Sequence, residues 1–275
     1  MHHKVILTLI LISCFIFLSS QVFSNDSMAE VKAGGLVLKQ TKDIRMVKED
    51  LYLSLTEIRV SSIFINDSDN DISTTIAFPV PNIPLSPEGD INIDLTSENP
   101  LSFSVTANDQ PVVIKTEKMN TTEHVQLTYY WNQVFPAKKS VTIRHQYKPA
   151  YGQSPLAMFD PSQPQKSPIF ENPQITQYCM DAGFLKSSQK LVADAAKNEK
   201  YPQSFTMGYI LTSGANWKGP IGEFNLIIEK KKQTDLVSLC INGIKKTGPT
   251  RFEVHQKDFL PKKDIQLLFL SDSYM

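Results

Sequence analysis

The chain has no excess of charge of either sign, since 28 Lys and Arg residues stand against 28 Asp and Glu residues among 275. Proteins that neutralise the phosphates of nucleic acids usually carry a basic excess arranged in patches or stripes. The largest basic run here is Lys230-Lys231-Lys232, which we interpret as a solvated hairpin tip. The sequence therefore predicts no nucleic-acid partner.

Recognised catalytic signatures are also missing. The sequence has no glycine-rich phosphate loop, no G-x-S-x-G elbow and no H-E-x-x-H motif. The alternating Asp67, Asp69 and Asp71 lack the glycine and the closing glutamate of a calcium loop. No histidine after residue 24 stands at ligand spacing from a cysteine, so neither a metal nor another cofactor is predicted. A hydrolase needs only two carboxylates, however, and Glu171 and Asp181 are candidates.

The sequence lacks a hydrophobic run long enough to span a bilayer. The longest run, Val5–Leu18, has about 14 residues, whereas a spanning helix needs about 20. Lys4 precedes this run, and the more polar segment Ser19-Ser20-Gln21-Val22-Phe23-Ser24 follows it. This pattern is typical of a secretory signal peptide over residues 1–24. We expect a periplasmic or secreted protein without a transmembrane anchor after cleavage.

A second interpretation of the N-terminus concerns Cys14. Leu11-Ile12-Ser13-Cys14 matches the pattern at which bacterial lipoproteins are cleaved and lipidated on the cysteine. Cleavage there would leave an apolar stretch from Phe15 to Leu18, where lipoproteins normally have a polar tether. Cleavage after Ser24 is the preferred interpretation, and lipid anchoring at Cys14 is the alternative.

Cysteine is scarce, and the signal peptide would remove one of the three. Cys179 and Cys240 remain, and the loss of Lys4 changes the net charge to 27 − 28 = −1. Two cysteines in an exported chain predict a disulfide bond. That bond would join the entry of a predicted helix to a predicted strand near Cys240.

From residue 25 to residue 148 the chain is composed of short strands separated by turn signals. Ile58, Val60 and Ser62 would share one face of a strand, and Tyr129 and Trp131 would share the buried face of another. No helical period lies between these strands, so this part is predicted to be an antiparallel β-sandwich.

Residues 149–173 contain six prolines and are predicted to be a crossover without regular elements, because proline lacks the amide donor of sheets and helices. Residues 174–275 then carry one amphipathic helix, capped by Asp181, and a series of strands predicted to be antiparallel. The apolar face of the helix comprises Phe184, Leu185, Ser188, Leu191, Val192 and Ala195. The fold class is therefore mainly β, or α+β for the whole chain.

The best candidate for a binding site is the segment Ser213–Pro220. Trp217 could stack on a sugar ring or cover a peptide, while Asn216 and Lys218 supply hydrogen bonds. The alternative is structural: the indole would close the edge of the sandwich.

Short motifs spread along the mature chain support a family resemblance. They are Ala33–Leu36, Lys48–Leu53, Thr74–Pro81, Val134–Ala137, His145–Pro149, Thr212–Gly222 and Ser238–Cys240. Together they resemble a bacterial family of exported proteins that is classed only as a domain of unknown function. The resemblance implies export and a β-rich fold and brings no catalytic residues. The segment ending in Phe78–Pro81 is also faintly similar to the β-sandwich domains of vault and inter-alpha-trypsin-inhibitor proteins.

Two hypotheses about function follow. The first is a non-enzymatic binding or scaffold module of the cell envelope, whose partner is an envelope protein, a polysaccharide or a peptide. The alternative is an envelope hydrolase that acts on glycans with a carboxylate pair.

The N-terminal interpretation makes a testable prediction. Mass spectrometry of the exported protein should find Asn25 as the first residue, because Val22 and Ser24 occupy the positions that signal peptidase reads before the cut. A lipidated N-terminal Cys14 would contradict this prediction and establish the lipoprotein alternative.

Overall fold

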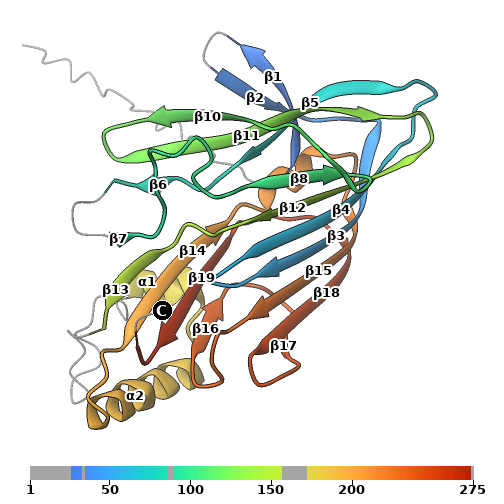
Figure 1. The fold of residues 1–275 in the computed structure, drawn as a ribbon. Coiled ribbons are helices and arrows are strands. Elements are labelled where there is room, and N and C mark those ends of the chain that lie inside the picture. The colour runs from blue at the N-terminus through green and yellow to red at the C-terminus, as the bar shows by residue number, and fades with distance from the viewer. Residues whose placement is uncertain (1–25, 33–34, 86–89, 157–171, 274–275) are drawn as a thin grey trace, which may run out of the picture.

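The computed structural model describes residues 26–32, 35–85, 90–156 and 172–273. The predicted signal peptide, with Cys14, lies outside these residues, as does Glu171. The described chain forms three β-sheets and few helices (Figure 1). The predicted mainly β class is confirmed.

The first sheet, sheet A, has the strand order β10-β11-β5-β1-β2, and the short β6 also pairs with β11. Every pairing in it is antiparallel. Its strands are β1 (Ser27–Lys32), β2 (Gly35–Lys39), β5 (Ile72–Pro79), β6 (Ile83–Pro84), β10 (Lys115–Asn120) and β11 (His124–Phe135).

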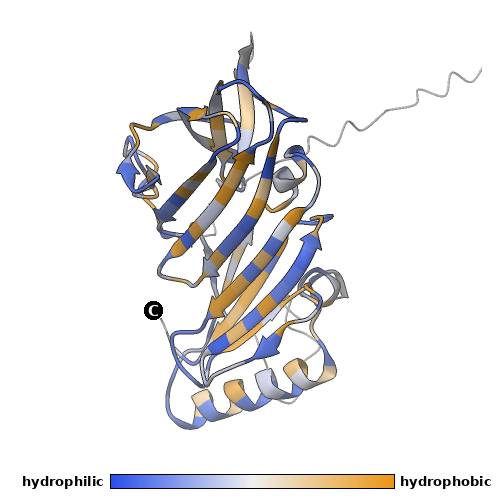
Figure 2. Ribbon diagram, turned by 90° about the vertical axis from the view of Figure 1, so that its right-hand side faces the viewer, coloured by the Kyte–Doolittle hydropathy of each residue, from blue (hydrophilic) through white to orange (hydrophobic). Residues whose placement is uncertain are grey.

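Sheet B is the largest, with the strand order β17-β18-β15-β3-β4-β12-β8-β9. Its strands are β3 (Ile44–Leu53), β4 (Ile58–Asn66), β8 (Ser104–Ala107), β9 (Gln110–Pro111), β12 (Ser140–Tyr147), β15 (Ile221–Glu229), β17 (Lys245–Lys246) and β18 (Arg251–Phe259). Figure 2 shows hydrophobic and hydrophilic residues alternating along such strands, the pattern of a sheet with one face in the core.

One pairing in sheet B is parallel and joins distant parts of the chain. β15 lies beside β3 with Glu223 opposite Lys48 and Ile228 opposite Leu53. The two β-rich parts predicted at 25–148 and 174–275 therefore share one sheet. Only antiparallel strands were expected, because an alternating pattern shows which face a residue occupies but not which strand lies beside it.

The third sheet, sheet C, has the strand order β16-β19-β14-β13-β7. Its strands are β7 (Asp90–Ile91), β13 (Gly152–Pro155), β14 (Gln203–Tyr209), β16 (Leu236–Leu239) and β19 (Ile265–Ser271). One face joins the core of the sandwich, and the other packs against helices α1 (Asn172–Tyr178) and α2 (Ala182–Lys197). The helices lie at the lower end of the molecule in Figure 1.

Helix α2 matches its prediction closely. The Asp181 side chain caps its start, accepting a hydrogen bond from the Phe184 amide at 2.6 Å. The described helix buries Ser188, Leu191, Val192 and Ala195, four of the six residues on the predicted apolar face. The other two, Phe184 and Leu185, are half-buried against the same cluster.

The main core lies between sheets A and B. Tyr129 and Trp131 on β11 are buried, as alternation predicted, and the Tyr129 ring stacks on Phe103 with 4.3 Å between ring centroids. On β4, Ile58, Val60 and Ser62 are all buried. The alternating pattern alone thus placed the inward faces of these strands correctly.

Regular structure extends into both ends of the proline-rich segment, where none was predicted. Strand β13 ends at Pro155, and α1 has Pro173 in its first turn. Proline is tolerated there because the first amides of a helix have no partner within it. The number of prolines indicated an irregular segment, but whether a proline is compatible with a strand or helix depends on its position within that element.

The basic run Lys230-Lys231-Lys232 is not a wholly solvated hairpin tip. Lys230 is buried, and its Nζ donates hydrogen bonds to the carbonyl oxygens of Gln233 at 2.9 Å and Asp235 at 2.5 Å. Burial lowers the pKa of Lys230. Only Lys231 is fully exposed, while Lys232 forms an ion pair with Asp272.

Over the described residues, no helix combines the length and apolar character that crossing a membrane requires.

The contact between β15 and β3 yields a prediction about stability. Gly222 packs so closely on a register shift in β3 that an added Cβ would lie 2.6 Å from the Val47 carbonyl oxygen. Gly222→Ala should therefore lower the free energy of unfolding by about 1–3 kcal/mol, measured by urea denaturation. The control is Gly248→Ala, whose Cβ would make an ordinary 3.4 Å contact with Arg251. Equal unfolding midpoints for the two variants would contradict the close contact.

Candidate functional site

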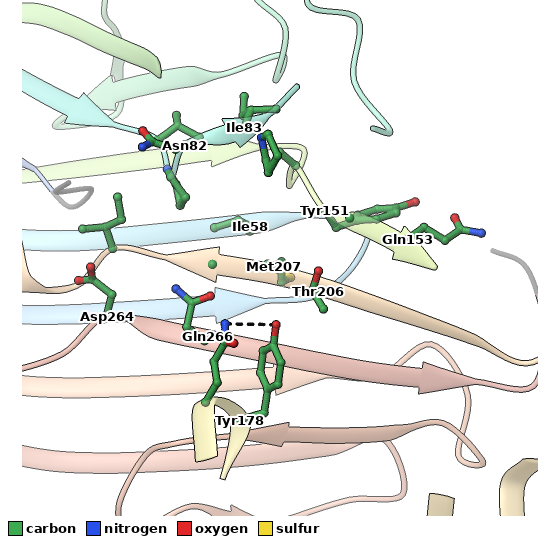
Figure 3. Close-up of a pocket in the computed structure, with 18 of the residues that line it drawn as sticks. Ile58, Asn82, Ile83, Tyr151, Gln153, Tyr178, Thr206, Met207, Asp264 and Gln266 are labelled. Atoms are coloured by element: carbon green, nitrogen blue, oxygen red, sulfur yellow. Dashed lines mark hydrogen bonds between the residues drawn. The ribbon is translucent and has the colours of Figure 1, made fainter. Parts of the chain in front are cut away.

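A cavity of about 530 Å³ opens where the three sheets meet (Figure 3). Sheet A contributes the segment around β6, sheet B contributes Ile58 and Tyr147, and sheet C and α1 form the opposite walls. The lining residues are Ile58, Val80, Pro81, Asn82, Ile83, Pro84, Tyr147, Ala150, Tyr151, Gly152, Gln153, Ser154, Gln177, Tyr178, Thr206, Met207, Gly208, Ile210, Asp264 and Gln266.

Local sequence explains why space remains at this junction. The prolines around Val80 and Asn82 prevent a continuous regular strand between β5 and β6, because each lacks an amide donor. Gly208 on β14 has no side chain, and it faces Gln266 on the neighbouring β19. Three sheets thus meet at a corner that their side chains do not fill.

The Tyr151 wall is held in place by hydrogen bonds from a loop. The Tyr151 amide donates to Asn92 Oδ1 at 2.9 Å, and Asn92 Nδ2 donates to the Pro149 carbonyl at 2.9 Å. The Tyr151 ring also packs edge-on against Phe205, with 5.6 Å between centroids. This wall is therefore ordered by the fold itself.

Helix α1 forms another wall and is tied to sheet C. Gln177 Nε2 donates to the Tyr178 hydroxyl at 3.4 Å, and Ser238 Oγ donates to the Tyr178 carbonyl at 2.8 Å. The turn that follows carries Cys179, which is bonded to Cys240 with 5.1 Å between their Cα atoms. The disulfide predicted from composition thus anchors one wall of the cavity.

The phenol groups of the lining are neutral over the physiological range. Burial raises the pKa of Tyr147 well above its ordinary value of 10, and burial also raises the pKa of Tyr151 and of Tyr178. These side chains offer hydroxyl groups and ring faces, not charges.

Asp264 is the one carboxylate among the described lining residues, and its Oδ1 is already engaged. It accepts hydrogen bonds from the Leu211 amide at 3.0 Å, the Thr212 amide at 3.0 Å and Thr212 Oγ1 at 2.8 Å. These contacts hold the start of the 3₁₀ helix η3 (Thr212–Asn216). Asp264 therefore has a structural role at the cavity rim.

Two amide side chains in the lining have unused hydrogen-bonding capacity. Asn82 Oδ1 is buried and has no hydrogen-bond partner among the described residues. The side chain of Gln266 lies across Gly208 and is exposed, so its amide group is open to the cavity and to solvent, and of the two only Asn82 contributes a buried acceptor. A buried acceptor without a partner costs about 1–3 kcal/mol, so this arrangement favours a donor supplied from within the cavity.

The binding residues predicted from sequence lie elsewhere, and the indole among them is buried. Trp217 is 3% exposed, contacts Phe64 and donates from Nε1 to the Asp26 carbonyl at 2.7 Å. Asn216 Nδ2 donates to Ser27 Oγ at 3.0 Å. In this structure the segment closes the sandwich against β1, the structural alternative considered for it.

Lys218, the third of the predicted binding residues, forms an ion pair at the surface beside this segment. Its Nζ lies 2.9 Å from Asp67 Oδ2, and Arg45 Nε lies 3.1 Å from Asp67 Oδ1. These hydrogen bonds, with Lys218 the larger contributor, lower the pKa of Asp67. The turn that begins with Asp67 is therefore held by cationic side chains.

The buried histidine and carboxylate side chains of the described residues lie in the core, outside the cavity lining. His145 Nε2 is 3.1 Å from Asp26 Oδ2, with both side chains fully buried, and the Tyr209 hydroxyl donates to Glu49 Oε1 at 3.4 Å. No three acidic, histidine or cysteine side chains of the described ranges are placed to hold a metal ion. Strict alternation from the buried Ile44 and Met46 would place Glu49 on the outward face of β3. The register shift between Met46 and Lys48 reverses the alternation, so Glu49 turns inward.

None of the cavity residues was selected from the sequence. Each is a common residue type within a strand, turn or short helix, and the walls come from segments more than 200 residues apart in sequence, such as Ile58 and Gln266. The cluster of prolines around Asn82 was the available signal, since it marks an interruption of the sheet.

Comparison with known families gives one match. The model of DUF4424, described as a domain of unknown function, matches residues 24–124 and 118–268. No curated protein matches the chain.

Among solved structures, a protein from Legionella pneumophila has the same fold. It is described as a candidate nutrient-binding protein, is 16% identical and aligns with a TM-score of 0.54 over 90% of this chain and 70% of its own.

Two further solved structures match more weakly. An M1 zinc metallopeptidase of Deinococcus radiodurans is 10% identical, with a TM-score of 0.30 over 84% of this chain and 43% of its own. Yeast LTA4 hydrolase in complex with bestatin is 10% identical, with a TM-score of 0.33 over 83% of this chain and 29% of its own. The chain spans less than half of either enzyme, and we draw no inference from them.

The disulfide yields the prediction for this site. Cys179→Ser or Cys240→Ser should lower the free energy of unfolding by about 4 kcal/mol, because the bond closes a loop between residues 61 apart in sequence. Thermal unfolding of each variant is compared with that of the wild type in oxidising buffer. Added reductant should destabilise the wild type alone, and a wild type that melts identically with and without reductant would contradict the prediction.

Proposed function

The chain belongs to the DUF4424 family, a domain of unknown function, and from that premise we propose that it is a non-enzymatic binding module of the cell envelope. The cavity at the junction of the three sheets holds a small ligand in this proposal. In this proposal the protein acts by binding the ligand, and the three sheets form the scaffold that holds the cavity walls.

The shape and lining of the cavity carry this proposal. Ligand pockets are commonly about 300–1,000 Å³, largely apolar, with a few polar groups that orient the ligand. This cavity has apolar walls, including Ile58, Ile83 and Met207, and polar groups from Asn82 and Gln266. The unpaired Asn82 Oδ1 is the strongest single observation, since a ligand donor would satisfy it.

The neighbour from Legionella supports binding as the general role. That protein is described as a candidate nutrient-binding protein, and it has the fold of this chain. The likeness of fold alone leaves the ligand of this chain to be identified from its own cavity.

Export is the second part of the proposal. It is supported by the signal-like residues 1–24 and by the Cys179–Cys240 bond, because disulfides persist in oxidising compartments. An envelope protein, a polysaccharide or a peptide is the class of partner that this location would offer.

The alternative of a glycan hydrolase has no comparable support. A glycosidase needs two carboxyl groups about 5–10 Å apart, and Asp264 is the only carboxylate in the described cavity lining. Asp181 caps α2, and Glu171 lies outside the described residues. The binding module is therefore the function that the geometry favours.

A cavity-filling variant tests the proposal. The purified mature protein is screened by thermal shift against neutral sugars, amino acids, short peptides, phosphate, dicarboxylates and polyamines. At least one class should raise the melting temperature by several degrees, since a ligand at 100 times its Kd stabilises by about 2.7 kcal/mol. Gly208→Val, which extends a side chain toward Gln266 and Pro81, should abolish the shift.

The matched control is Gly248→Val, which lies outside the cavity lining and should keep the full shift. The proposal fails if no class stabilises the protein, or if Gly208→Val responds to the ligand as the wild type does.

A further inference from the structure

The chemistry of the cavity lining goes beyond the existence of a pocket and identifies a class of ligand. We propose that the cavity binds an uncharged, hydroxyl-rich molecule of mono- to disaccharide size. This inference rests on the proposed function, and it follows from which polar groups the walls present and which they lack.

The described lining contains no lysine, arginine or histidine. Proteins hold carboxylates and phosphates with cationic side chains or with clusters of backbone amides. An anionic ligand in this cavity would lose its hydration without gaining a positive partner, which is costly in a partly apolar site. The lining therefore disfavours anions.

The same walls offer little to a cation. Tyr147, Tyr151 and Tyr178 are neutral hydroxyl groups, and Asp264 Oδ1 already accepts three hydrogen bonds from the start of η3. Asp264 is also the single carboxylate of the described lining, so a ligand with several positive charges would find no second one in these walls.

The polar groups that are present match hydroxyl groups. An amide side chain such as Asn82 or Gln266 both donates and accepts hydrogen bonds, and so does a tyrosine or threonine hydroxyl. Each hydroxyl of a sugar also does both, so one sugar can satisfy several of these groups at once. In Figure 3, Asn82, Gln266 and Tyr151 come from different walls around the cavity.

The apolar part of the lining is equally suited to a sugar ring. Pro81, Pro84 and Ala150 keep accessible apolar surface for the C–H faces of a pyranose, while Tyr151 adds an aromatic ring at one side. The cavity volume of about 530 Å³ is within the range that holds compact organic ligands.

A peptide is less well matched to these walls. Extended peptides bind best by adding a strand to a free sheet edge, which supplies rows of backbone donors and acceptors. The sheet C strands that line the cavity are β13, β14 and β19, and β13 pairs with β14 over Gln203–Thr206 alone. Over Met207–Tyr209, β14 is paired with β19 on one side only. A free edge of three residues offers an extended peptide few backbone partners.

Calorimetric titration with named probes tests the inference. The mature protein is titrated with maltose, cellobiose, trehalose and N-acetylglucosamine, and separately with glutamate, inorganic phosphate, spermidine and trialanine. At least one saccharide should bind, and none of the other four should. Asn82→Leu and Gln266→Leu should each raise the saccharide Kd at least tenfold, because each removes the polar group that faces a sugar hydroxyl.

Gln110→Leu is the matched control, since Gln110 is an exposed glutamine on β9 outside the cavity lining, and it should keep the wild-type Kd. Far-ultraviolet circular dichroism and the melting temperature establish that each variant is folded. If Asn82→Leu does not fold, Gln266→Leu decides the result, because Gln266 is the exposed residue within the otherwise buried strand β19.

The outcomes separate this inference from the proposed function. Binding of glutamate, phosphate, spermidine or trialanine that Gly208→Val abolishes would overturn the saccharide class and leave the cavity as a binding site. Saccharide binding that neither cavity variant weakens would overturn the assignment to these walls. No binding of any probe would overturn both.

Discussion

The parallel pairing of β15 with β3 is the constraint on which the rest of the structure depends. It makes sheet B continuous from β17 to β9 and places strands from the end of the chain beside strands from its beginning. Tyr209 of sheet C can then reach Glu49 of β3, so the third sheet is held against the sandwich. The corner at which the sheets meet, and the cavity within it, exist because this pairing fixes their relative positions.

The cavity combines a rigid frame with a local departure from good packing. Native cores fill space to the density of organic crystals, and a buried amide oxygen normally has a partner. Near Asn82 neither condition holds, whereas the surrounding walls are fastened by the Asp264 cluster, by Asn92 and by the disulfide. In the proposed function, a site whose supporting contacts are satisfied while its inner groups are not would be organised before a ligand arrives.

Sequence patterns predicted what depends on neighbouring residues. Alternation placed Tyr129 and Trp131 in the core, and the three–four period and Asp181 defined α2. The Cys179–Cys240 bond is the exception among distant contacts, because only two cysteines remain after residue 24. What depends on distant contacts was not predicted: the parallel pairing, the inward turn of Glu49 and the cavity itself. Trp217 shows the same limit: the sequence left open whether its indole binds a ligand or closes the sandwich, and only the three-dimensional structure reveals the carbonyl and rings that enclose it.

The contact between Trp217 and Asp26 also bears on how the chain folds. These residues are 191 positions apart, and β1 begins directly after Asp26. Closing so long a loop costs entropy before any contact compensates for it, and topologies rich in such contacts fold slowly. Since synthesis proceeds from the N-terminus, the indole that covers the start of β1 emerges only after most of the chain. The first strand of the protein is thus among the last to gain its complete set of neighbours.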